Sequence, residues 1–99
     1  MLPLLRSSGA GCITAATNLV AADMRTIYDH FTDDAAVAAA QARVTAWRAV
    51  TTAYVQIPTV KAMIGLKTGE PGWTRVRPPL LPLDDVQLAD VAARFAALA

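Results

Sequence analysis

The two lysines of this sequence, Lys61 and Lys67, are its best candidates for covalent chemistry. A lysine amine can form a Schiff base with a carbonyl substrate, provided that a desolvated pocket lowers its pKa. Both lysines fall on one expected helix, which opens at Pro58 and ends near Lys67, just before Gly69. We interpret both as structural or surface residues.

Cys12 and His30 are the other candidates for nucleophilic or acid–base work. Cys12 stands between Gly11 and Ile13 with no histidine near it in the sequence, so a buried small apolar residue is the favoured interpretation. A single cysteine excludes an intramolecular disulfide, which fits a reducing compartment. His30 is expected near the end of a helix, in a surface or packing role. The spacing of His, Cys, Asp and Glu predicts no metal site.

Charged pairs in the sequence are explained by helix ends. Asp33-Asp34 and Asp84-Asp85 look like paired carboxylates, but each pair precedes a helical pattern, where capping and the helix dipole favour acidic groups.

Three basic residues could form a small anion site, although a solvated or ion-paired surface is favoured: Lys67, Arg75 and Arg77. Three aromatic residues are expected in the core under a proline-rich segment: Trp47, Tyr54 and Trp73.

The elements that position these residues are mostly helical. Asn18 is expected to cap the first full helix, and Gln87, three residues after Asp84, indicates a capping box at the last one. Gly- and Pro-rich residues 69–83 are expected to be irregular. The expected helices cover residues 2–8 (the end of a helix), 18–31, 33–55, 58–67 and 85–98.

One short strand is expected at Gly11–Ala16. It lacks strict alternation, as a parallel strand buried on both faces does. Nothing downstream has convincing strand character except residues 75–77, which are cut short by prolines. The backbone groups of this strand would therefore be unpaired, at roughly 1–3 kcal/mol for each buried group. The strand therefore indicates a sheet whose other strands are not found in this sequence.

Composition limits the classes of function. The chain has 99 residues, of which 55% are hydrophobic and 17% charged, with a formal net charge of +1. It is too apolar for a disordered chain, and it gives no argument for a nucleic-acid or membrane partner. No apolar stretch approaches the roughly 20 residues of a membrane span, and the N-terminus does not fit a signal peptide. The expected location is the cytoplasm.

Three blocks, in order, resemble one family over essentially the whole chain. Residues 9–18, Gly-Ala-Gly-Cys-Ile-Thr-Ala-Ala-Thr-Asn, resemble the eighth strand of the dihydrodipicolinate synthase / N-acetylneuraminate lyase barrel. Residues 56–62 resemble the Pro-x-x-x-Lys helix of that family. Residues 77–83 resemble the segment before its last helix. The resemblance implies an α/β fold, a (β/α)8 TIM barrel with an appended helical domain, of which this chain would be a mostly α C-terminal fragment.

The resemblance also implies a division of the chain and a chemistry. Residues 1–31 would supply the end of helix 7, strand 8 and helix 8, and residues 32–99 the helical domain. Family members are lyases, such as aldolases, that form a Schiff base between a barrel lysine and pyruvate or another 2-oxo acid. The catalytic lysine and tyrosine come from earlier strands, so no catalytic residue is assigned here and no cofactor is expected. The resemblance places Ile13, Thr14 and Ala15 at the substrate-binding mouth of the barrel.

Two functions of different class stay open. The chain is either a fragment of such a lyase or synthase, inactive alone, or a helical module that binds partners without catalysis. Expected partners of the first are pyruvate in the complete enzyme, the remaining barrel portion and further copies of the chain. We expect no nucleic acid, membrane or metal.

Overall fold

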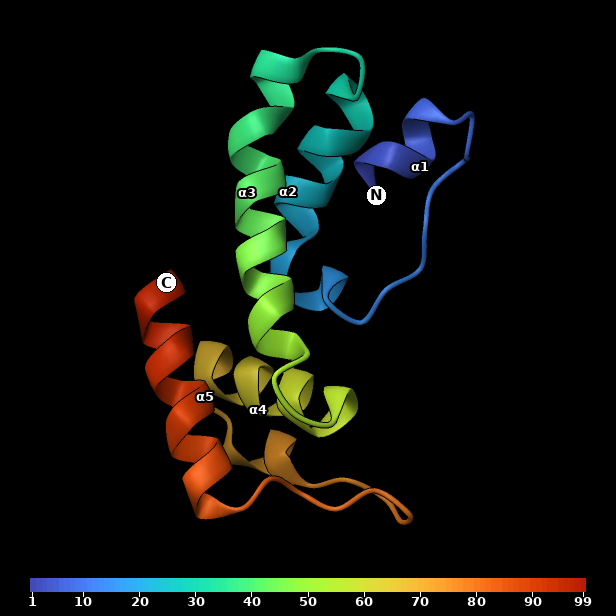
Figure 1. The fold of residues 1–99 in the computed structure, drawn as a ribbon. Helices are drawn as coiled ribbons and strands as arrows, with labels where there is room; N and C mark the ends of the chain where they lie inside the picture. Colours follow the sequence, from blue (N-terminus) through green and yellow to red (C-terminus); the bar gives the residue numbers. More distant parts are fainter. The chain divides into compact units, whose positions relative to one another are not determined.

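Helices dominate the structure, a computed structural model that describes residues 1–99 (Figure 1). The chain divides into two compact units, Met1–Trp47 and Arg48–Ala99, with the boundary inside α3. The expectation of a mostly α chain is confirmed. In order, the elements are α1 (Leu2–Arg6), α2 (Thr17–His30), α3 (Asp34–Thr51), α4 (Gln56–Thr68), the 3₁₀ helix η1 (Pro71–Thr74) and α5 (Asp85–Leu98).

In the first unit, the short helix α1 is held against the α2–α3 turn. Leu5 is buried, and Arg6 donates from Nε to the carbonyl of Phe31 at 2.9 Å while it pairs with Asp34. The helix ends with Ser8 in the left-handed conformation at φ 65° and with Gly9 donating to the carbonyl of Leu4 at 2.9 Å. A Cβ at Gly9 would lie 2.8 Å from that carbonyl oxygen, which explains a glycine there.

Helices α2 and α3 form an antiparallel pair whose buried residues recur at helical spacing. The pair is tied by an ion pair between Arg43 and Asp23 at 2.6 Å. Asp33 caps α3 as expected, accepting from the amides of residues 35 and 36. The expected cap of α2 is wrong: the helix begins at Thr17, and Asn18 instead donates its amide to the carbonyl of Ala15 at 3.0 Å. Buried residues of the pair include Val20, Met24, Ile27, Val37 and Val44.

In the second unit, α4 packs against both η1 and α5. Gly69, with φ 76°, ends α4 and donates to the carbonyl of Gly65 at 2.8 Å. Asp84 and Gln87 form the expected capping box at the start of α5. Pro58 is the third residue of α4, not the first, because that helix begins at Gln56. The buried side chains of this unit include Thr51, Thr59, Val60, Met63, Leu83 and Val91.

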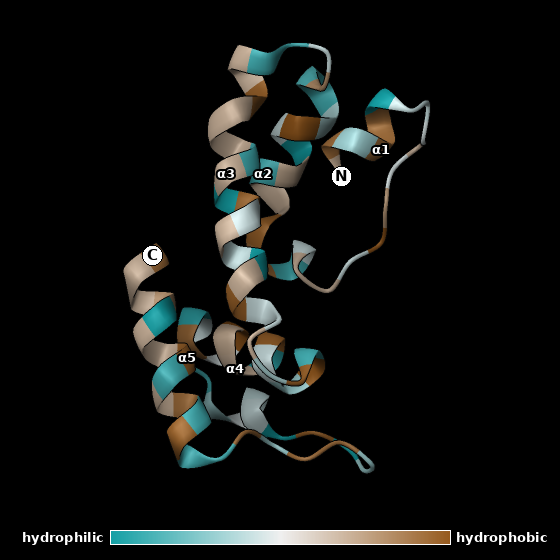
Figure 2. Ribbon diagram, in the orientation of Figure 1, coloured by the Kyte–Doolittle hydropathy of each residue, from teal (hydrophilic) through white to brown (hydrophobic).

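The expected strand at Gly11–Ala16 is not formed. A strand requires a neighbour to accept and donate its ladder hydrogen bonds, and this chain forms no other strand. The backbone groups of residues 10–13 make no hydrogen bond, and Gly11 has a positive φ of 149°. Figure 2 shows this link between α1 and α2 coloured from white to brown over most of its length. Residues 10–13 of the link are all exposed.

Two burial expectations are also wrong. Cys12 was expected inside a sheet, and it is exposed because that sheet is missing. Trp73 was expected under the proline-rich segment, but it lies in η1 with 41% of its surface exposed, since residues 75–83 leave its ring partly uncovered. Trp47 and Tyr54 are half-buried, between a core and a surface position. None of the helices combines the length and the apolarity that crossing a membrane would require.

Candidate functional site

The residues placed at the substrate mouth by resemblance lie consecutively, just before α2. Ile13 is fully exposed, whereas Thr14 and Ala15 are half-buried. Thr14 makes local hydrogen bonds to the backbone. Its carbonyl accepts a hydrogen bond from the amide of Thr17 at 3.2 Å, and its hydroxyl accepts one from the amide of Ala16 at 3.3 Å. These contacts fix the first turn of α2. They leave Ile13 facing solvent, so its role beside a substrate stays a prediction.

Both lysines lie on α4 in the C-terminal unit, away in sequence from those three residues. The Lys61 ammonium donates to the carbonyl of Arg75, and this hydrogen bond ties α4 to the chain that follows η1. Lys61 therefore has a structural contact that explains it. Lys67, Arg75 and Arg77 are exposed, as the surface interpretation predicts.

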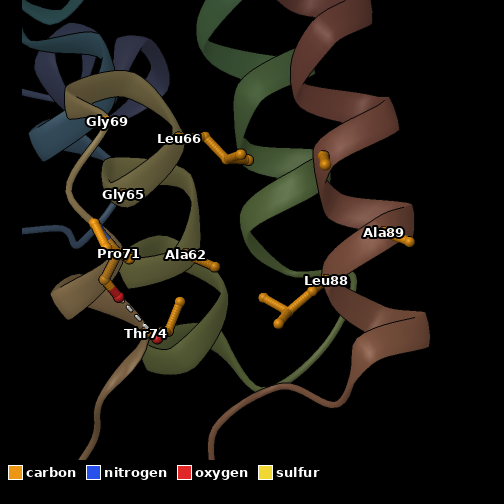
Figure 3. A pocket seen from close by; sticks show the side chains of 9 residues that line it. Ala62, Gly65, Leu66, Gly69, Pro71, Thr74, Leu88 and Ala89 are labelled. Atoms are coloured by element: carbon orange, nitrogen blue, oxygen red, sulfur yellow. Dashed lines mark hydrogen bonds between the residues drawn. The ribbon is translucent and has the colours of Figure 1, made fainter.

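A groove in the C-terminal unit has a volume of about 650 Å³. Figure 3 shows lining side chains on its two sides, Ala62 and Leu66 from α4 and Leu88 from α5. Thr74 is its only side chain with a polar group, and its hydroxyl is already used in donating to the carbonyl of Pro71 at 2.9 Å. With no titratable side chain, the groove can bind apolar groups but cannot transfer protons. The lining residues are Ala62, Gly65, Leu66, Gly69, Pro71, Thr74, Leu88, Ala89 and Ala92.

A polar cluster links the two ends of the C-terminal unit. The hydroxyl of Tyr54 donates to Oδ2 of Asp90 at 2.8 Å, and Nε of Arg94 donates to the same oxygen at 2.8 Å. The hydrogen bond from Tyr54, followed by that from Arg94, lowers the pKa of Asp90. The hydrogen bond to Asp90, with some burial, raises the pKa of Tyr54. The i, i+4 spacing of Asp90 and Arg94 could be found from sequence, but Tyr54 was assigned only an apolar role.

This cluster predicts a pH dependence of the stability of the C-terminal unit. Asp90 has a lowered folded-state pKa, so its contribution is present above the ordinary value of 3.8 and is lost as pH falls below it. Tyr54 has a raised pKa, so its contribution is present below 10.0 and is lost as pH rises above it. Urea unfolding at a series of pH values should show that the free energy of unfolding of the native chain falls at both ends of the pH range. The decreases should be smaller in Tyr54→Phe. Identical pH profiles for the two proteins would contradict the assignment.

The remaining acidic pairs and the histidine make no further site. Asp33 and Asp84 cap helices, as the sequence predicts, while Asp34 pairs with Arg6. His30 is exposed at the end of α2. Nowhere do three His, Cys, Asp or Glu side chains gather as ligands for a metal ion. These contacts define a helical chain in which ionisable side chains mainly cap helices and join segments.

Comparison with known proteins shows the family to which this chain belongs. The chain belongs to the dihydrodipicolinate synthetase family, whose family model matches residues 1–98. The family predicted from the three sequence blocks is thereby confirmed. Searches of curated proteins and of solved structures gave no significant match.

Proposed function

We propose that this chain is the C-terminal part of a Schiff-base lyase or synthase that acts on pyruvate or another 2-oxo acid. The observation that carries the proposal is the family match over residues 1–98. Residues 1–31 would then complete the barrel with strand 8 and its flanking helices, and residues 32–99 would form the appended helical domain. The complete enzyme, not this chain alone, would have the activity.

The unpaired link between α1 and α2 supports this proposal. The backbone N–H and C=O groups of four consecutive residues, 10–13, make no hydrogen bond, and the side chain of Ile13 is fully exposed to solvent. Backbone groups of this kind are normally paired in a folded protein, and parallel neighbours on both sides would pair all of them. The link therefore has the properties of a strand whose sheet is supplied from outside these residues.

The same placement would bring Ile13, Thr14 and Ala15 to a substrate. If residues 11–16 form a parallel barrel strand, these three lie at its C-terminal end, where barrel active sites are built. Ile13 would then present an apolar side chain beside the bound 2-oxo acid. The contacts of Thr14 with Ala16 and Thr17 would hold the strand end against the first turn of the next helix.

The chain itself would take no catalytic role. Neither lysine lies on the proposed strand, and Lys61 is engaged with the carbonyl of Arg75 in the helical domain. The Schiff-base lysine and the tyrosine that relays protons would come from earlier strands of the barrel. The partners of the chain would be that barrel portion, further copies of the assembled enzyme and the 2-oxo acid.

Trapping with borohydride tests where the chemistry lies. Incubation of this chain with pyruvate and borohydride should leave no covalent adduct on Lys61 or Lys67, as read by mass spectrometry of the intact protein and its peptides. A complete enzyme of the family is the positive control, and Lys61→Gln is the matched control for non-specific reduction. A pyruvate-dependent adduct that is lost in Lys61→Gln would show that the catalytic lysine is in this chain.

A second candidate function is a non-catalytic helical module that binds a partner. The apolar groove between α4 and α5 favours it, because its lining lacks the ionisable groups that catalysis would use. The two candidates differ in what they require. An enzyme part requires the seven preceding βα units of a barrel encoded in frame, or a partner that supplies them, whereas a binding module requires neither.

A further inference from the structure

We draw no further inference here: the strongest candidate, the apolar groove lined by α4, η1 and α5, has no charged residue in its lining, and nothing in the structure shows what covers it.

Discussion

Replacing Met63 by alanine is expected to remove most of the stability of the C-terminal unit. Met63 is fully buried on α4, the helix that packs against both η1 and α5. Truncation of a buried methionine costs about 2–5 kcal/mol, from lost burial and the cavity that remains. A unit of this size has in total only about 3–8 kcal/mol, at roughly 0.05–0.15 kcal/mol per residue. Urea unfolding followed by circular dichroism and tryptophan fluorescence measures the loss.

Leu66→Ala is the matched control for this prediction. Leu66 lies on the same helix, and 45% of its surface is exposed, so its truncation removes much less buried area. Its midpoint of unfolding should stay much closer to that of the native chain than the midpoint of Met63→Ala. Equal midpoints for both variants would show that α4 does not anchor a core in this unit.

The link between α1 and α2 should be the fastest site of proteolysis in the isolated chain. A protease that cleaves before large apolar residues should cut first at the Cys12–Ile13 bond, where the backbone makes no hydrogen bonds. The bond before Ile64 is the internal comparison, because it lies within α4 and can be cut only after local unfolding. If that opening costs about 3 kcal/mol, cleavage before Ile13 is favoured by roughly 100-fold.

Gly11→Pro and a time course with mass spectrometry complete the proteolysis test. Proline cannot adopt the positive φ of Gly11, so it holds the link in a different, more restricted conformation without touching a helix. Cleavage at Cys12–Ile13 should therefore slow, while cleavage before Ile64 is unchanged. Early cleavage inside α4, with the link intact, would contradict the description of residues 10–13 as unpaired.

How far the sequence predicts the structure depends on how local each feature is. The capping box of Asp84 and Gln87 and the glycine stop at Gly69 involve neighbours in sequence, so the residues alone predict them. The strand at residues 11–16 was predicted and is absent, because pairing depends on another strand and this chain has none. Its residues were nevertheless identified as needing a partner, and the unpaired backbone agrees with that.

At the candidate site, too, local features could be predicted from sequence and long-range contacts could not. The exposure of Cys12 and Trp73 was not predicted, because burial depends on what lies opposite in space. The Tyr54–Asp90 hydrogen bond was also missed, since it joins residues 36 positions apart. The family itself could be recognised from three blocks that follow one another in the family's order, and the family match extends over the same residues. The roles proposed for Ile13, Thr14 and Ala15 would depend on barrel strands that these residues do not include.

Amide hydrogen exchange at Gly11, Cys12 and Ile13 tests most directly the proposal that this link would form a strand of a complete barrel. In the isolated chain, these amides should exchange at the rate of an unstructured peptide, while those of Val60 and Met63 in α4 are protected. In a polypeptide that joins the chain to the seven preceding βα units of a family barrel, the three amides should become as protected as the α4 amides. Strong protection of Gly11, Cys12 and Ile13 in the isolated chain would show that the link is paired without a barrel, and would contradict the proposal.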